Sequence, residues 1–347
     1  MISARLQIRK KTLVALLGLF ICLCLAAFNL IRTPTWSTDV FEYQISYELI
    51  NETKFRDLAD FIQLSFEPAF IFTSIATGYF TKSVNFVLFL FALVSLVIKL
   101  VYIPSFYVKN KMVFILAYIL TYYFLLELTQ NRIAIATSIL LLGYHFLATK
   151  RRILFVGAVI FASLFHYTAV IALLALLFDG RNDRRTIIRH AVLLFILIVS
   201  YLALKSSIIF SVIESLDPKK ASYIYSTDND LGSGLVRITS VLIYQVLILI
   251  SCRPSLIKLA PPMVAAFHNI IFNLYAASIS IYFVLNSFGV VAVRLAEVFR
   301  NLEPLLLIIT LSYCCKKKKL LLVFVILISI FVNLQKNSNL YSGLFFY

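Results

Sequence analysis

The sequence predicts an all-α polytopic membrane protein with about 10–11 transmembrane helices. Hydrophobic residues make up 61% of its 347 residues and the mean hydropathy is +0.94, whereas soluble globular domains are closer to one-half apolar. The apolar residues gather in runs of about 20, the length that an α-helix needs to cross roughly 30 Å of hydrocarbon. We therefore expect a single integral membrane domain over residues 1–347, without a soluble catalytic domain.

The first apolar run, residues 12–31, follows the basic residues Arg5, Arg9, Lys10 and Lys11. A basic segment before an apolar run is typical of both a cleaved signal peptide and a retained first helix. This run is long and lacks a clean small-x-small cleavage site, so we expect a retained helix. The positive charges place the N-terminus in the cytoplasm.

Breaks in hydrophobicity delimit the later helices. Further spans are predicted at 85–103, 112–128, 133–148, 190–212, 236–252, 263–285, 295–314 and 320–334. Residues 62–80, interrupted by Pro68 and Gly78, are typical of a partial insertion from the exterior. Residues 153–178 are interrupted at His166, and each half, about 18 Å long as a helix, is too short to cross a membrane alone.

Basic clusters predict the orientation, because Lys and Arg gather on the cytoplasmic side of membrane helices. One arrangement places nineteen of the 32 basic residues inside with only Asp179 and Asp183 of the 16 acidic residues. Residues 153–178 then enter and leave on the cytoplasmic side, as a re-entrant segment with a polar tip buried in protein or lining a cavity. The exterior carries two long loops, at about 32–61 and 213–235.

Three arginines depart from this charge bias. Arg132, Arg237 and Arg294 precede apolar runs on the predicted exterior side, and arginine is costly in or near hydrocarbon. A shared anionic ligand explains all three, and a pyrophosphate on a lipid carrier is the first candidate. Arg132 also begins a helix, whose N-terminal N–H groups favour anions. The alternative is that its side chain extends to lipid headgroups.

Arg300 lies close to this group in the sequence. Arg294, Glu297 and Arg300 recur at a helical spacing of three residues. Such a set forms ion pairs along the surface of a helix, or it faces a polar cavity in which it binds an anion. Both interpretations stay open at this point.

His166 is the candidate for proton transfer, because it is the only histidine in a predicted broken helix. A neutral imidazole accepts a proton near neutral pH. His145 and His268 lie within apolar spans, where a hydrogen-bonded packing role is expected. Because the chain has no Walker-type glycine loop and no His-Glu-x-x-His segment, we expect a mechanism that uses neither a metal nor another cofactor.

The formal net charge of +16 does not predict a nucleic-acid partner. A nucleic-acid-binding protein concentrates its positive charge on a soluble domain, and no such domain is expected here. Orientation in the membrane explains the excess of basic residues, so membrane lipids are the expected surroundings.

Three segments of the chain resemble a known family. They are Asn131-Arg-Ile-Ala-Ile-Ala, Thr149-Lys-Arg-Arg-Ile-Leu-Phe and Ala162-Ser-Leu-Phe-His-Tyr-Thr-Ala-Val-Ile. Together they look like the central signature of the EpsG/Wzy-type polymerases of bacterial surface polysaccharides, including O-antigen. The similarity extends to Asp39–Tyr43 and to Arg294-Leu-Ala-Glu-Val-Phe. One departure is Ile133, since family members often have Gln-Gly after the arginine.

The resemblance implies a GT-C-like helical fold and polymerisation of undecaprenyl-pyrophosphate-linked repeat units at the periplasmic face of the bacterial inner membrane. It implies glycosyl transfer with inversion at the anomeric carbon and with undecaprenyl pyrophosphate (Und-PP) as the leaving group. It also implies a chain-length regulator protein as a partner. The roles that follow are pyrophosphate binding by Arg132, Arg294, Arg237 and Arg300, and proton transfer by His166 or Asp39. A flippase, an O-antigen ligase and a membrane O-acyltransferase are the competing interpretations, although no internal repeat supports a flippase.

Overall fold

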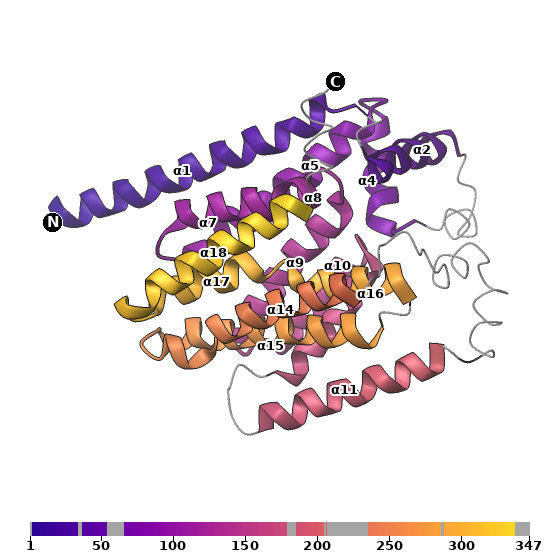
Figure 1. Cartoon of the computed structure of the whole chain (residues 1–347). Coiled ribbons are helices and arrows are strands. Elements are labelled where there is room, and N and C mark those ends of the chain that lie inside the picture. Colours follow the sequence, from indigo (N-terminus) through magenta and orange to yellow (C-terminus); the bar gives the residue numbers. More distant parts are fainter. Residues whose placement is uncertain are drawn as a thin grey trace. The chain divides into compact units, whose positions relative to one another are not determined.

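Helices account for the regular structure in the described part of the chain (Figure 1). The computed structural model describes residues 2–33, 37–53, 66–178, 185–204, 206, 235–285 and 288–336. Six helices there are long and apolar enough to cross a membrane. The prediction of an all-α polytopic membrane protein is therefore confirmed, whereas the count of 10–11 spans stays a prediction.

The chain divides into two compact units. The first contains residues 1–146, 152–170 and 326–347, and the second contains residues 147–151 and 171–325. The predicted loop at 213–235 lies outside the described residues, except for Leu235, which begins a helix.

In the first unit, α1 (Ile2–Ile31) packs along α5 (Val84–Leu96) and the π-helical turn η2 (Val97–Tyr102) (Figure 1). The helix continues as α6 (Ile103–Tyr107). Pro104, at the start of α6, has no N–H to donate to the preceding turn, and π-helical turns accommodate such interruptions. The span predicted at 85–103 is thus a longer, irregular helix.

The next helices of this unit form an outward and a returning path. The outward path is α7 (Lys111–Tyr118), the π-helical turn η3 (Ile119–Tyr123) and α8 (Phe124–Glu127). The returning helix α9 (Asn131–Ala148) is the most enclosed of the six membrane-length helices, with 72% of its residues buried.

A buried ion pair joins η2, which continues α5, to α8. Lys99 on η2 donates to Glu127 Oε1 on α8 at 3.0 Å, and both side chains are at most 3% exposed. Ser95 and Tyr118 donate to the same oxygen at 2.9 and 2.7 Å. Because an unpaired charge at this depth is costly, this cluster fixes the helices relative to one another.

The predicted break at His166 is present. The helix α10 (Arg152–Ser163) ends three residues before His166, and the 3₁₀-helix η4 (Tyr167–Leu177) follows. Gly143 on α9 lets α10 approach closely, since a Cβ there would lie 3.3 Å from Ala158 Cβ and from the Phe155 ring. The side of the membrane on which this segment lies stays a prediction.

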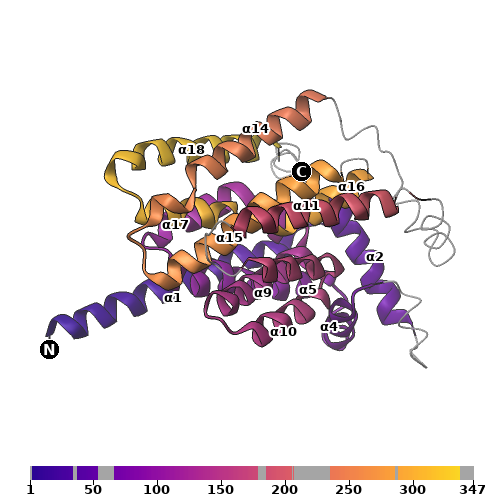
Figure 2. The ribbon, with the colours of Figure 1, turned by 90° about the horizontal axis from the view of Figure 1, so that it is seen from below.

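Two shorter helices stand before α5. Residues 38–52 of the predicted exterior loop form α2 (Thr38–Glu52), whose first turn is capped by the Ser37 hydroxyl, which accepts from Val40 N at 3.3 Å. The helix α4 (Pro68–Gly78) packs against α2 (Figure 2). Gly78 allows this close contact, because a Cβ would lie 1.9 Å from Asn51 Oδ1 and the Asn51 side chain would have to move.

The second unit is centred on α15 (Pro262–Val284), which packs against four other described α-helices. Those neighbours are α11 (Arg185–Leu204), α14 (Leu235–Ser251), α16 (Gly289–Arg300) and α17 (Glu303–Tyr313). The short 3₁₀-helix η6 (Pro254–Ile257) leads into α15, and α18 (Lys316–Lys336) follows α17. Many apolar side chains on α11 and α18 are exposed, as expected for helices that face lipid.

The prediction of one continuous helix over residues 295–314 was wrong. Residues 295–314 are divided between α16 and α17, with a turn at Asn301 and Leu302. The cause is Pro304, which favours the first turn of a new helix and cannot donate within a continuing one.

Candidate active site

The site in the first unit is built around Glu67, which caps the start of α4. Its backbone is extended, with φ −68° and ψ 137°, and Pro68 follows as the first helical residue. The Glu67 carbonyl accepts from Phe70 N and Ile71 N at 3.0 and 3.2 Å. Because the carboxylate makes no capping bond to its own helix, it is available to side chains from other elements.

The two carboxylate oxygens of Glu67 bind two different partners. Oε2 accepts a hydrogen bond from Arg132 Nη1 in the first turn of α9, and Oε1 is 2.9 Å from His166 Nδ1 at the break after α10. Glu67 is 5% exposed, so this Arg–Glu–His cluster is largely shielded from solvent. A carboxylate can only accept, which makes Nδ1 of His166 the donor and leaves Nε2 as the acceptor in the neutral ring.

The charge state of Glu67 supports this assignment. Burial alone raises the pKa of Glu67, but the hydrogen bond from His166 and the positive charge of Arg132 together lower it below the ordinary value. Glu67 is therefore ionised at neutral pH. An ionised carboxylate on Nδ1 fixes the tautomer of the imidazole and stabilises the imidazolium that forms when Nε2 takes up a proton.

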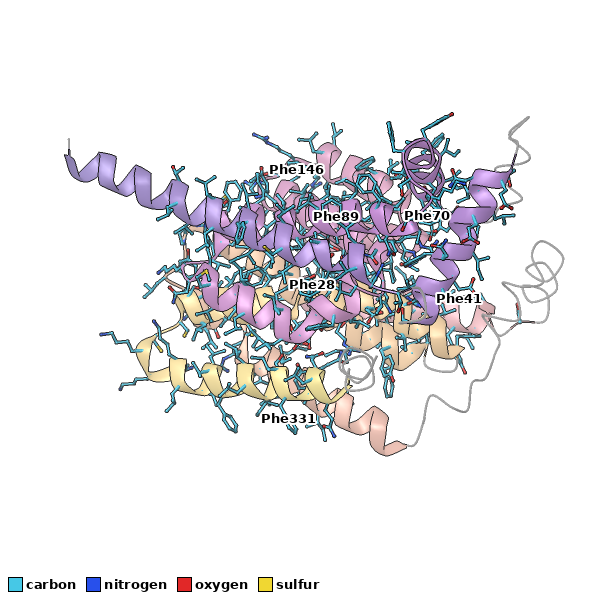
Figure 3. The ribbon with its side chains drawn as sticks, turned by 90° about the horizontal axis from the view of Figure 1, so that it is seen from above. Phe28, Phe41, Phe70, Phe89, Phe146 and Phe331 are labelled. Carbon is cyan, nitrogen blue, oxygen red and sulfur yellow. The ribbon has the colours of Figure 1, made fainter. Side chains whose placement is uncertain are left out.

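Aromatic rings hold the Arg132 guanidinium. Its central carbon lies 4.8 Å from the centre of the Tyr43 ring and 5.5 Å from that of the Phe70 ring. Tyr43 comes from α2. Phe70, which is labelled in Figure 3, comes from α4. Stacking on aromatic faces favours a guanidinium and fixes its plane.

Main-chain contacts fix the break that carries His166. Ala69 N donates to Leu164 O at 2.9 Å, and the Tyr167 hydroxyl donates to Phe66 O at 3.0 Å. The start of α4 and the break are therefore held together by backbone and side-chain bonds at once. The geometry of Glu67 and His166 does not depend on their own hydrogen bond alone.

Three polar atoms around this cluster are buried without a hydrogen-bond partner in the described part of the chain. They are Arg132 Nε, His166 Nε2 and Thr168 Oγ1. Such atoms are rare in folded proteins and call for an explanation. A hydroxyl donor against His166 Nε2 and an anionic acceptor at Arg132 Nε would satisfy the two that the cluster orients.

The predicted site residues fall in both units. Arg132 and His166 meet through Glu67, and Asp39, half-buried on α2, is close enough to act electrostatically on Arg132. Arg294 and Arg300 lie on α16 in the second unit. Arg237 lies on α14, and its side chain is outside the described residues. The convergence of these arginines with Arg132 stays a prediction.

The second unit has its own buried carboxylate. Glu303, at the start of α17, accepts from the Tyr244 hydroxyl through Oε1 and from the Tyr275 hydroxyl through Oε2 at 3.2 Å. It is fully buried and, like Glu67, it precedes a proline. The packing histidines behave as expected, since His268 Nε2 is 2.9 Å from Thr310 Oγ1 and His145 Nδ1 is 2.7 Å from the Tyr107 hydroxyl in the first unit.

Sequence reasoning missed Glu67, although a signal was present. Glu67 is the only charged residue between Ile62 and Phe80, and an acidic residue in a membrane-length apolar segment marks a functional site by default. The expectation of a metal-free mechanism also assumed that the chain has no Asp-x-Asp pair on a loop, which is wrong, because Asp228 and Asp230 form one. This pair lies outside the described residues, and a metal-free mechanism stays a prediction.

These features define a polytopic helical membrane protein with a buried Arg–Glu–His cluster beside its apolar helices. The chain belongs to the EpsG family, whose sequence profile matches residues 15–346. Comparisons with curated proteins and with solved structures gave no match.

Proposed function

We propose that this protein is a glycosyltransferase that polymerises undecaprenyl-pyrophosphate-linked oligosaccharide repeat units at the periplasmic face of the bacterial inner membrane. Membership of the EpsG family supports a polysaccharide polymerase. The proposed chemistry rests on the orientation of His166. Its Nδ1 faces the Glu67 carboxylate, and its buried Nε2 has no hydrogen-bond partner among the described residues.

In the proposed reaction, His166 Nε2 accepts the proton of a sugar hydroxyl on the acceptor repeat unit. The hydroxyl oxygen forms a bond to the anomeric carbon of the donor chain while the bond from that carbon to the pyrophosphate oxygen breaks. The electron pair of the broken bond stays on the undecaprenyl pyrophosphate. The configuration at the anomeric carbon inverts, because the oxygen attacks opposite the leaving group.

Glu67 has two tasks in this scheme. It stabilises the positive charge that develops on the imidazole, and it fixes the guanidinium of Arg132 through its second oxygen. Preorganised charges in a site that excludes water stabilise a transition state more than they would in solution. Arg132, with Arg294, Arg237 and Arg300, then offsets the negative charge that develops on the pyrophosphate.

The test uses purified protein and lipid-linked repeat units from cells that lack the polymerase. The native protein is expected to give a ladder of chain lengths on a gel. His166→Gln is expected to lower the rate by about 10²–10⁴-fold with folding retained. His145→Gln is the matched control, because it removes a histidine that bonds to Tyr107; its rate should stay near the native value.

Other outcomes identify the competing activities. Transfer of a single unit to lipid A core identifies a ligase, and movement of the lipid-linked units across vesicles without new bonds identifies a flippase. A ladder that forms at the native rate with well-folded His166→Gln rules out His166 as the base, and Asp39→Asn is then the next variant to measure.

A further inference from the structure

Arg32 is a buried arginine at the end of α1 to which the sequence pattern assigned no role. It is 6% exposed, although its chain neighbours Ile31 and Thr33 are both exposed. The guanidinium is therefore buried at a point where the adjacent residues of the chain are exposed.

The guanidinium of Arg32 is only partly satisfied. Nη2 donates to Asn131 Oδ1 at 3.1 Å, whereas Nε and Nη1 are buried and have no hydrogen-bond partner among the described residues. Two buried lysine or arginine side chains are described, and the other, Lys99, has the Glu127 carboxylate as its partner. Arg32 forms no ion pair within the described part of the chain, so its charge is not offset there.

Asn131 places Arg32 beside the Arg–Glu–His cluster. Its side-chain nitrogen donates to Glu127 O at 2.6 Å and to Asn29 Oδ1 at 3.2 Å. These bonds orient the side-chain oxygen of Asn131, which accepts the hydrogen bond from Arg32. Arg132 is the next residue in the chain, and Tyr43, on whose ring Arg132 stacks, lies near both guanidiniums. Two arginines from different helices therefore share one neighbourhood in the first unit.

The two arginines differ in what they can offer a ligand. The charge of Arg132 is already offset by Glu67, whereas burial without a carboxylate lowers the pKa of Arg32 to about 10. An isolated buried cation costs several kcal/mol unless it is paired. The end of α1 provides a partial negative charge, but a helix terminus typically contributes only about 0.3–1 kcal/mol. An additional anionic group would supply what Arg32 lacks.

We propose that Arg32 binds a phosphate group of the substrate, as the principal guanidinium of an anion site in which Arg132 and Asn131 hold the neighbouring positions. The inference rests on the proposed function for the identity of the anion, the pyrophosphate of a polyprenyl-linked sugar. Nε and Nη1 lie on two different edges of the guanidinium, so each can donate to a separate phosphate oxygen, and the remaining N–H of Nη2 can complete a bidentate pair with either one.

The experiment measures binding rather than polymer formation. Native protein in nanodiscs is titrated with farnesyl pyrophosphate, with farnesol and with inorganic pyrophosphate, and the midpoint of thermal unfolding is recorded without ligand and at each concentration. Three variants are compared with it: Arg32→Gln, which removes the charge; Arg32→Lys, which keeps the charge without the paired donors; and Arg152→Gln, an exposed control on α10.

Farnesyl pyrophosphate should stabilise the native protein and farnesol should not. Arg32→Gln should unfold at a temperature equal to or above that of the native protein without ligand, because an unpaired buried cation has been removed, and its affinity should fall at least tenfold. Arg32→Lys should bind with intermediate affinity and Arg152→Gln should bind normally. Stabilisation by inorganic pyrophosphate alone to the same extent would identify a site for free anions.

Unchanged affinity in Arg32→Gln would overturn the inference, whatever its effect on polymer length. A large loss of stability without ligand would also count against it, because that result assigns Arg32 a structural role at the end of α1. Loss of binding in Arg32→Gln together with a protein that forms no ladder would keep the anion site and refute the polymerase.

Discussion

Glu67 connects three segments that are distant in the sequence. It lies 65 residues from Arg132 and 99 residues from His166, yet one carboxylate holds both. The sequence indicated Arg132 and His166, because one starts a helix on the predicted exterior side and the other interrupts an apolar run. It did not indicate their connection, because no local periodicity relates residues so far apart. Arg32 was missed for a related reason, since its hydrogen-bond partner Asn131 lies 99 residues away.

Replacing Glu67 with Gln should destabilise the protein at neutral pH, because Arg132 loses its counter-charge in a largely buried position. Removing one partner of a buried ion pair costs about 3–5 kcal/mol, and the exposed part of Arg132 reduces this figure. The midpoint of thermal unfolding in detergent measures the effect. Glu48→Gln on α2, whose carboxylate is exposed and bonds only Gln44 among the described contacts, is the matched control.

The same variant makes a prediction about pH. The pKa of Glu67 is lower in the folded protein than its ordinary value of 4.5, so the folded state binds fewer protons than the unfolded state in this range. The stability that Glu67 contributes is present above pH 4.5 and is lost as the pH falls through the lowered pKa. The difference in unfolding midpoint between native protein and Glu67→Gln should therefore shrink on acidification. A difference that grows would contradict the ionised state of Glu67.

At the scale of elements, the apolar runs predicted where helices occur better than how they are interrupted. The break at His166 was predicted, since a polar cluster divides an apolar run there. The π-helical turns at Val97–Tyr102 and Ile119–Tyr123 were not predicted, because they preserve hydrophobicity and change only the hydrogen-bond pattern. The helix α2 was taken for part of a loop, since its apolar content is low.

Two glycines provide a test of how α9 and α10 are held together. Gly143→Leu should be destabilising, because even a Cβ at this position would press on Phe155 and Ala158, and a core overpacked in this way typically loses about 1–3 kcal/mol. Gly157→Leu on the exposed face of α10 has no heavy atom within 4 Å of the added Cβ and should be tolerated. The midpoint of thermal unfolding and the polymerase rate should both fall in Gly143→Leu and not in Gly157→Leu. The contact at Gly143 positions α10, which leads into the break at His166.

At the scale of the whole molecule, the orientation predicted from charge can be measured directly. An introduced cysteine at Ser226, in the predicted exterior loop, should react with a membrane-impermeant reagent added outside the cell, and one at Arg184 should not. Both positions lie outside the described residues, so labelling would identify the side of the membrane on which each of these two segments lies. Labelling of the Arg184 position from outside would reverse the predicted topology of residues 153–178.

The ion pair between Lys99 and Glu127 also constrains how the protein is made. The two residues are 28 positions apart, so at a synthesis rate of about 5–20 residues per second Lys99 leaves the ribosome a few seconds before its partner. During that interval a helix with a lysine near its centre must wait at the insertion machinery, where such a residue costs about 2.5–3.5 kcal/mol. The helices at 84–107 and 111–127 are therefore expected to enter the lipid as a pair, with the lysine released from the translocon only after the glutamate has arrived.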